Sequence, residues 1–341
     1  MTEYAILLSP STNRVYARSS IRLLWSEIGA FNDTVLGGKV REMSETSIGG
    51  VPYIVLTADE FTDTDIAYLS NLSSRYALFE RIGDLLRPIE ITPLDKFDSD
   101  LLTIQKYSGK TNEHFTKLLL NIAAVYTAAP ERLLDGRLRV LDPMCGRGTT
   151  LNQAMMYGLS AAGVDADGRD IDAYSTFVKT WLKNSRIKHN VETATIRRGR
   201  ERIGRRLDIS VGVTKELYKA GKTLDISVVN GDTLDIGEFF KPESFDVVVA
   251  DTPYGVQHES RGRQVSRSPV ELLQRAIPAW TPIVRAGGTI GLSFNTYVVK
   301  RQQLAEILAA SGLSVVDTGD FTHRVDQAIN RDLIVARKAP A

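Results

Sequence analysis

The sequence is poor in residues that cross-link or bind metals. It contains one cysteine, Cys145, in 341 residues, which excludes an intrachain disulfide and is typical of a reducing compartment. The four histidines are scattered along the chain and form no metal-ligand spacing with that cysteine. We therefore expect a protein without a metal site.

Long apolar runs are also lacking. No stretch approaches the roughly 18 apolar residues that a transmembrane helix needs. The first residues, MTEYAILLSP, have no basic segment ahead of a long apolar one, so a signal peptide is not expected. These absences favour a soluble, cytoplasmic protein that does not associate with a membrane.

The net charge is only +1, but the charge is unevenly distributed. Residues 183–222 contain 12 lysines and arginines against four acidic residues. A basic segment is most often a solvated surface, yet an excess of positive charge also suits contacts with the phosphates of a nucleic acid. Both interpretations of this segment stay open at this point.

The pattern of apolar residues divides the chain near residue 95. Residues 1–95 are expected to form a small α/β domain, a candidate RNA-binding unit, and the proline-containing segment 87–97 is expected to be a linker. The elements predicted in this domain are strands at 4–8, 14–17 and 51–56 and a helix at 62–79.

Residues 96–341 alternate between helical and strand patterns. Their apolar runs of four to six residues, unbroken by polar alternation, are typical of strands buried on both faces. The alternation predicts a Rossmann-like α/β domain with a parallel sheet covered by helices. The predicted strands are 139–143, 161–167, 226–232, 245–251, 287–295, 313–321 and 332–338, and the predicted helices are 111–128, 149–157, 170–184, 269–284 and 298–311.

A glycine-containing loop, VLDPMCGRGTT, follows the first of these strands. The strand ends at Asp142, Gly146 and Gly148 follow, and a helix starts at Thr149. Glycines at this point allow a tight turn and the close approach of a ligand to the backbone, at the edge where such sheets bind ligands. A strand-to-helix turn that simply needs glycine would look the same.

Two later acidic residues favour the ligand interpretation. Asp165 ends the next strand, 17 residues after Gly148, a spacing that suits a carboxylate bound to two ribose hydroxyls. Asp232 ends the following strand, where it could accept a hydrogen bond from an exocyclic amino group. The loop lacks the third glycine expected for a pyrophosphate, which argues against a dinucleotide and favours a nucleoside ligand without phosphates.

The stretch VVADTPYGVQH ends the fourth strand with Asp251, Thr252, Pro253 and Tyr254. The carboxylate and the backbone carbonyl of Thr252 could accept both hydrogen bonds of an amino group on a flat ring. Pro253 restricts the backbone before and at its own position, and Tyr254 could stack on the ring. We expect these four residues to be catalytic.

Together, the segments DPMCGRGT and DTPYG with Asp165 and Asp232 resemble S-adenosylmethionine-dependent amino-methyltransferases. YSGKTNEHF (107–115) makes the chain most similar to the tRNA guanosine-N2 methyltransferases. The resemblance implies S-adenosyl-L-methionine as cofactor, with contacts at Thr111, Asn112, Phe115, Asp142, Met144, Gly146, Gly148, Thr149, Asp165 and Asp232. The commonest form of the target motif has proline where this chain has Thr252, and this difference bears on the identity of the base.

A second basic cluster, ESRGRQVSR, follows the target motif directly. Arg261, Arg263 and Arg267 are expected to bind the substrate near the base pocket. Cys145 lies in the glycine loop and not beside Pro253, which argues against cytosine methylation at carbon 5, because that reaction needs a cysteine nucleophile.

These patterns predict transfer of a methyl group to an exocyclic amino group of a nucleobase, guanine N2 in tRNA being preferred. The same target motif serves adenine N6 and cytosine N4, so a DNA methyltransferase is an alternative. A protein glutamine methyltransferase is a further alternative, which the basic clusters disfavour. A nucleic-acid-binding protein without catalysis is another, which the intact motifs disfavour.

Overall fold

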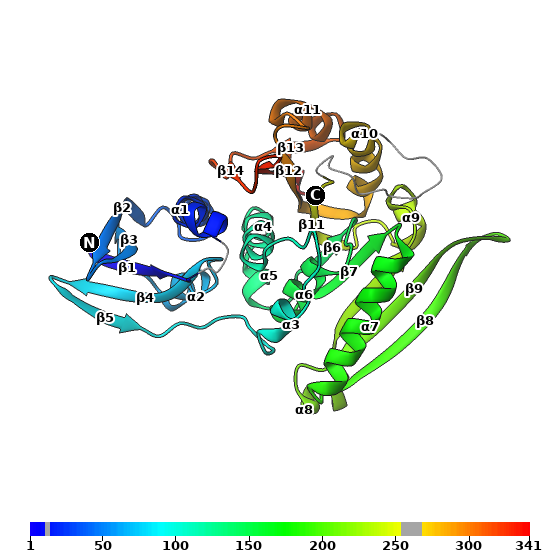
Figure 1. Cartoon of the computed structure of the whole chain (residues 1–341), viewed down its shortest axis with the longest axis horizontal. Helices are drawn as coiled ribbons and strands as arrows, with labels where there is room; N and C mark the ends of the chain where they lie inside the picture. The colour runs from blue at the N-terminus through cyan, green and yellow to red at the C-terminus, as the bar shows by residue number, and fades with distance from the viewer. Residues whose placement is uncertain (11–13, 254–267) are drawn as a thin grey trace.

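The computed structural model describes residues 1–10, 14–253 and 268–341, and it contains two β-sheets (Figure 1). The first sheet lies in the N-terminal part and the second in the remainder of the chain. No helix in these ranges is both long enough and apolar enough to cross a bilayer.

The N-terminal sheet has five antiparallel strands in the order β2-β3-β1-β4-β5. Two expectations for this region are wrong. Residues 14–17 belong to helix α1 and not to a strand, and the helix expected at 62–79 ends at Leu69 and is followed by strand β4. The elements are β1 (Thr2–Leu8), α1 (Arg14–Thr34), β2 (Val40–Ile48), β3 (Val51–Ala58), α2 (Asp63–Leu69), β4 (Arg75–Ile82) and β5 (Leu85–Ile89).

Contacts formed in the folded protein explain both differences. Ser70 caps the end of α2, and the next residues pair with β1, so the sheet overrides the helical appearance of residues 75–79. In α1, Leu24, Ile28 and Phe31 recur at helical spacing and are completely buried. Four residues at the start of that helix were too few to reveal this periodicity.

The second sheet has the order β13-β15-β12-β11-β6-β7-β10-β9-β8, with β14 beside β15. Its central strands β12, β11, β6, β7 and β10 are all parallel, which confirms the Rossmann-like α/β class. The strands are β6 (Arg139–Asp142), β7 (Ser160–Asp165), β8 (His189–Arg198), β9 (Glu201–Val211), β10 (Leu224–Asn230), β11 (Phe245–Asp251), β12 (Val284–Asn295), β13 (Leu313–Val315), β14 (His323–Arg324) and β15 (Asn330–Lys338).

Helices cover both faces of this sheet (Figure 1). In β11, Val247 and Val249 face the core formed with α4, α6 and α7, whereas Val248 and Ala250 face the core formed with α9, α10 and α11. The helices are α3 (Asp100–Thr103), α4 (Glu113–Val125), α5 (Glu131–Leu134), α6 (Thr149–Met156), α7 (Gly168–Asn184), α8 (Lys215–Lys219), α9 (Ile236–Phe239), α10 (Pro269–Trp280) and α11 (Arg301–Ala310), with 3₁₀ turns η1 (Thr233–Asp235) and η2 (Thr281–Ile283).

The basic segment between β7 and β10 forms a long antiparallel hairpin, β8–β9, followed by the short helix α8. Strand β9 pairs with β10 from Leu224 opposite Val211 to Asn230 opposite Arg205. The hairpin therefore extends the sheet at its β10 edge, where the sequence alone indicated only a long crossover.

A buried carboxylate connects the N-terminal part to the second sheet's helices. Glu27 on α1 is completely buried and accepts hydrogen bonds from the backbone N–H of Ser73 (2.9 Å), the Ser73 hydroxyl (2.6 Å) and the side-chain amide of Asn121 on α4 (2.8 Å). The Tyr157 hydroxyl donates to the other side of Asn121 at 2.9 Å. Side chains around this network form one continuous apolar core.

We expect Glu27→Ala to lower the free energy of unfolding by about 2–3 kcal/mol, because Ser73 and Asn121 would each keep a buried donor without its acceptor. Urea titration followed by circular dichroism measures this change. Glu45→Ala, which removes an exposed carboxylate on β2, is the control and should change stability by less than about 0.5 kcal/mol. Equal stability of the two variants would contradict the role assigned to Glu27.

Candidate functional site

The parallel strands bring their carboxyl ends to one edge of the second sheet. Asp142 ends β6, Asp165 ends β7 and Asp251 ends β11, while Asp232 lies two residues beyond the end of β10. Open α/β sheets bind ligands outside this edge. The four acidic residues singled out in the sequence therefore lie along the same edge.

The glycine loop connects β6 to α6 with two residues in left-handed conformations. Gly146 has φ +48° and Gly148 has φ +77°. A Cβ atom on Gly148 would lie 2.3 Å from the ring of the buried Tyr174, so backbone conformation and close packing both require glycine there. Around Gly146, by contrast, an added Cβ would meet no described atom within 4 Å.

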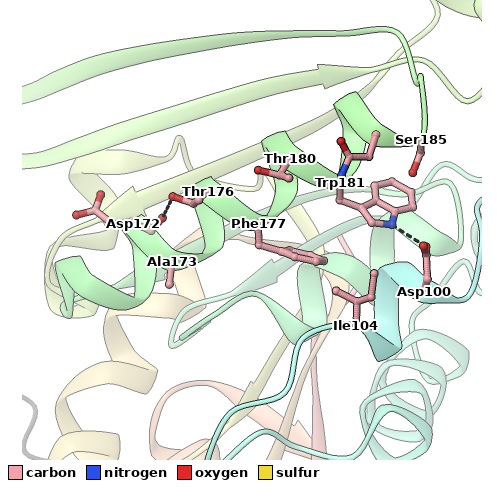
Figure 2. A pocket seen from close by; sticks show the side chains of 10 residues that line it. Asp100, Ile104, Asp172, Ala173, Thr176, Phe177, Thr180, Trp181 and Ser185 are labelled. Carbon is pink, nitrogen blue, oxygen red and sulfur yellow. Dashed lines mark hydrogen bonds between the residues drawn. The ribbon is translucent and has the colours of Figure 1, made fainter.

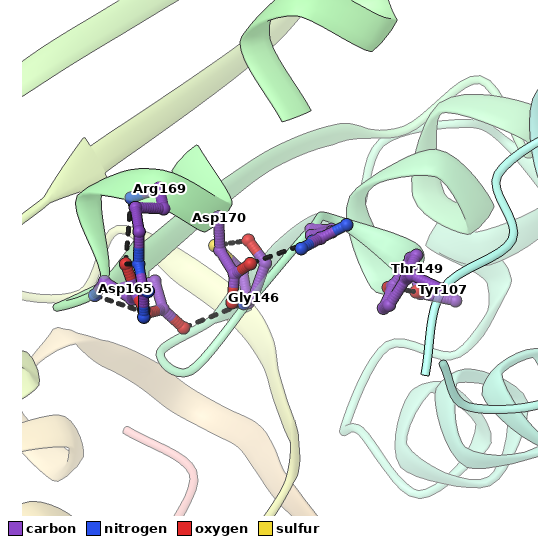
Figure 3. Close-up of polar contacts among 9 residues, drawn as sticks. Tyr107, Gly146, Thr149, Asp165, Arg169 and Asp170 are labelled. Carbon is purple, nitrogen blue, oxygen red and sulfur yellow. Dashed lines mark hydrogen bonds and ion pairs between the residues drawn. The ribbon is translucent and has the colours of Figure 1, made fainter. Parts of the chain in front are cut away.

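The carboxylate of Asp165 holds this loop (Figure 3). It accepts hydrogen bonds from the backbone N–H of Gly146 at 2.9 Å and of Asp167 at 2.8 Å. Burial raises the pKa of Asp165 above its ordinary value. A carboxylate has about four acceptor positions, so two oxygens bonded in this way can still accept from a pair of hydroxyls.

Asp142 is the most deeply buried of the strand-end acids, with an exposed fraction of 4%. It accepts from the backbone N–H of Met144 at 3.0 Å and from the side chain of Thr150. Burial, together with the negative charges of Asp165 and Asp251, raises the pKa of Asp142 to about 7. The edge thus favours a ligand that carries positive charge.

The segment before α4 bridges the glycine loop and the end of β11. The Tyr107 hydroxyl and the Thr149 hydroxyl are hydrogen-bonded at 3.0 Å (Figure 3), and the Thr111 hydroxyl donates to Asp251. Asn112 caps α4 by accepting from the backbone N–H groups of His114 (2.9 Å) and Phe115 (3.3 Å). Thr111 therefore contacts a predicted catalytic residue, whereas Asn112 stabilises the helix.

Arg331, at the start of β15, is a site residue that the sequence patterns did not reveal. Its guanidinium lies 3.8 Å from the Asp251 carboxylate and 4.4 Å from the ring centroid of Phe115. Phe115 is completely buried, and its ring centroid also lies 5.2 Å from that of His323. Burial lowers the pKa of His323 to about 4, so this ring is neutral, and Arg331 supplies a positive charge beside Asp251.

Arg331 did not stand out in the sequence, because the same strand also contains Asp332, Arg337 and Lys338. Its antiparallel register, with Arg331 opposite Asn295 on β12, brings it to the carboxyl edge of the parallel strands. That register is a property of the assembled sheet and cannot be read from the strand by itself.

Thr252 is 1% exposed and is bonded to the neighbouring strand. Its backbone N–H (3.0 Å) and its hydroxyl (2.8 Å) both donate to the carbonyl of Ser293 on β12. Proline at this position would lack both donors. These two hydrogen bonds therefore explain why threonine, and not proline, occupies this position. Pro253, which follows, is exposed.

The remaining predicted residues have different surroundings. Asp232 is exposed and caps η1 by accepting from the backbone N–H of Leu234 at 2.9 Å. Met144 packs at the margin of the apolar core around β11. The residues expected to contact substrate beyond Pro253 lie outside the described ranges: Tyr254, Arg261, Arg263 and Arg267.

Cys145 is buried, and burial raises the pKa of its thiol well above the ordinary value. Its Sγ atom lies where a Cβ atom on Gly163 would come within 2.7 Å, so it packs between the loop and β7. Across residues 1–10, 14–253 and 268–341, no three His, Cys, Asp or Glu side chains are placed to hold a metal ion.

One hollow in the described part of the chain lies away from this edge. A cavity of about 670 Å³ runs along the outer face of α7, between Phe177, Trp181 and Ile104 (Figure 2). Trp181 and Asp100 both line it, and the Trp181 indole donates to Asp100 at 2.6 Å. None of the strand-end acids lines this cavity.

Residues 129–277 match the family described as RMKL-like, methyltransferase domain. The matched range contains the glycine loop and all four strand-end acids, and it is somewhat less than half of the chain. The protein carries an S-adenosylmethionine-dependent methyltransferase domain, and S-adenosyl-L-methionine is its cofactor. No curated protein sequence matches the chain.

Solved structures of low identity also align with the chain. Magnesium protoporphyrin IX methyltransferase from Synechocystis is 14% identical, with a TM-score of 0.39, over 68% of this chain and 87% of that one. The 1,6-didemethyltoxoflavin-N1-methyltransferase from Burkholderia thailandensis is 13% identical, with a TM-score of 0.36, over 69% of this chain and 93% of that one.

The edge of the sheet fits this cofactor chemically. Asp165 can accept from ribose hydroxyls, Gly146 leaves space beside the backbone, and the buried carboxylate of Asp142 complements a positively charged group. When bound, the cofactor would supply an electrophilic methyl group. The segment 107–112 and the glycine loop would hold it against Asp251.

We expect the affinity for S-adenosylmethionine to rise with pH up to about 7 and then level off. The folded-state pKa of Asp142 is about 7, well above its ordinary value of 3.8, so the carboxyl is mostly protonated at lower pH. A cationic ligand favours the ionised form, and binding should strengthen by up to about tenfold for each pH unit below 7.

Isothermal titration calorimetry of the wild-type protein and of Asp142→Asn measures this dependence. The asparagine keeps the shape of the side chain but cannot ionise, so its profile should be flatter across the same pH range. A wild-type profile as flat as that of the variant would show that Asp142 does not govern cofactor binding.

Proposed function

We propose that the protein transfers a methyl group from S-adenosylmethionine to an exocyclic amino group of a nucleobase, with guanine N2 in tRNA as the preferred target. The observation that carries this proposal is the environment of Asp251. Its carboxylate ends the central strand β11, accepts a hydrogen bond from Thr111 and lies beside Arg331. A carboxylate held in this way can act as a fixed hydrogen-bond acceptor for substrate.

The chemistry needs acceptors more than it needs a strong base. The lone pair of an exocyclic amino group is conjugated with its ring, so the nitrogen is a poor nucleophile. Asp251 would accept one N–H and the backbone carbonyl of Thr252 the other, which favours a lone pair that points toward the methyl donor. The nitrogen becomes cationic on methylation and then loses a proton, which Asp251 or water can accept.

The anchoring of Thr252 supports this role for its carbonyl. Two hydrogen bonds to one carbonyl of β12 hold the residue in place, and Pro253 restricts the backbone immediately after it. The Thr252 hydroxyl is one of these donors, so it is engaged within the sheet. We infer that the backbone of Thr252, and not its side chain, contacts the substrate.

We prefer RNA over DNA as the substrate because residues 107–115 resemble the corresponding segment of the tRNA guanosine-N2 methyltransferases. Residues 107–112 contact the glycine loop through Tyr107 and the target motif through Thr111, so they adjoin both the cofactor side and the acceptor side of the site. We further propose that residues 1–95 form a small α/β domain that assists RNA binding, and that the enzyme is cytoplasmic.

Labelled cofactor incubated with total tRNA, genomic DNA or protein extract tests this proposal. We expect label in tRNA, and nucleoside mass spectrometry should identify N2-methylguanosine. Label in DNA alone would favour an adenine-N6 or cytosine-N4 methyltransferase instead, and label in protein alone would favour a glutamine methyltransferase. Absence of transfer to any of these would contradict the proposed activity.

We expect Asp251→Asn to lower kcat by at least about a hundredfold, because the carboxylate would become an amide with one acceptor fewer and a donor aimed at the substrate. Cofactor affinity, measured by calorimetry, should change little. Asp225→Asn is the matched control, because Asp225 lies at the opposite edge of the same sheet and is exposed. Equal activities of the two variants would contradict the role of Asp251.

Arg331 should act through Asp251. We expect Arg331→Met, which keeps an apolar side chain against Phe115, to lower kcat about tenfold while the KM for S-adenosylmethionine stays the same. Arg331→Lys, which keeps the charge but not the planar contact, should retain more activity. Circular dichroism checks that both variants fold, and an unchanged kcat in Arg331→Met would exclude this positioning role.

A further inference from the structure

The β8–β9 hairpin reaches beyond the edge of the sheet on which the site lies. Asn230, the last residue of β10, pairs with Arg205 of β9 and also with Asp165 of β7. Residues 201–204 of β9, and their partners in β8, therefore extend past the carboxyl ends of the parallel strands. At about 3.3 Å per residue, this overhang is roughly 13 Å long. Figure 1 shows the hairpin continuing well past the neighbouring strands.

The end of this hairpin is strongly basic. Residues 196–202 contain Arg197, Arg198, Arg200 and Arg202 against Glu201, and all five side chains are exposed. Arg198 lies 3.9 Å from Glu201 and 3.3 Å from Asp235. Within the described part of the chain, no carboxylate forms an ion pair with the other three arginines.

Contacts with the sheet hold the hairpin end in place. Arg198 reaches Asp235 on η1, and Arg206 donates to the carbonyl of Phe239 on α9 while its guanidinium lies 5.3 Å from the ring centroid of Phe240. Ile196 and Ile203 pack against the apolar core on this side. The turn η1 begins directly after Asp232, so these contacts fix the arginines beside the edge that carries the acidic residues.

We propose that Arg197, Arg200 and Arg202 bind the phosphate backbone of the RNA whose target base enters at Asp251. This inference rests on the proposed function. Guanidinium groups bind phosphates through pairs of parallel hydrogen bonds and position a nucleic acid without reading its sequence. A fixed arm with three arginines would thus orient the RNA while Asp251 and Thr252 hold the base.

The composition of the hairpin favours a polyanion over a protein partner. Protein interfaces depend on buried aromatic or large aliphatic anchors. Gly199 and Glu201 lie among the arginines, Thr193, Ala194 and Thr195 precede them on β8, and no exposed large apolar side chain occurs between residues 189 and 205. The surface therefore offers charge and hydrogen bonding, as a phosphate backbone requires.

The test replaces Arg197, Arg200 and Arg202 with alanine in the full chain. Fluorescence anisotropy with labelled total tRNA, at several salt concentrations, should show at least about tenfold weaker binding. The slope of the logarithm of the binding constant against the logarithm of the salt concentration should become shallower by about two to three, which corresponds to the loss of two to three phosphate contacts. Cofactor affinity measured by calorimetry should stay the same, because these arginines do not contact the glycine loop.

A matched control replaces Lys215, Lys219 and Lys222 with alanine. These substitutions remove the same charge from the same basic segment. The three lysines are exposed, but they adjoin the start of β10 at the opposite edge of the sheet. The control should bind tRNA nearly as well as the wild-type protein. A hairpin variant that binds and methylates tRNA like this control would overturn the inference and leave the proposed function intact. A wild-type protein that neither binds nor methylates RNA would overturn both.

Discussion

The parallel pairing of β6, β7, β10 and β11, with both faces of the sheet buried, is the constraint on which the rest of the molecule depends. Parallel strands need crossover connections, so each strand must end at the same edge and each helix must return across a face. Buried valines on alternate sides of β11 show that both faces are needed. The convergence of the acidic residues at one edge follows from this arrangement, and so does the place of the ligand.

At that edge, the carboxylates of Asp142 and Asp251 have different surroundings. Asp142 is buried and its pKa is raised to about 7, whereas Asp251 is supplied with a hydroxyl donor from Thr111 and a nearby cation from Arg331. One carboxyl can therefore respond to the charge of a bound ligand while the other is held as a hydrogen-bond acceptor. Asp142 and Asp251 each end a parallel strand. The difference between them comes from the segments packed beside each one, such as those that contain Thr111 and Arg331.

The elements that were predicted correctly are those with strong local signals. Continuous apolar runs identified the buried strands, and the glycines after the first of these strands marked the turn into helix α6. The errors fell where tertiary contacts override local preference. Residues 75–79 look helical but pair with β1, and the basic segment forms a hairpin because the edge of β10 offers it a partner.

The sequence by itself determined the alternation of strands and helices that builds the central parallel sheet, the glycines of the loop, and the acids at the strand ends, because these depend on local backbone chemistry and apolar patterning. Only the tertiary structure decided which residues meet. Thr111 and Arg331 are 140 and 80 positions away from Asp251, and no local pattern records such contacts. The position of the arginines on the hairpin likewise depends on the register between β9 and β10, which exists only when the sheet has formed.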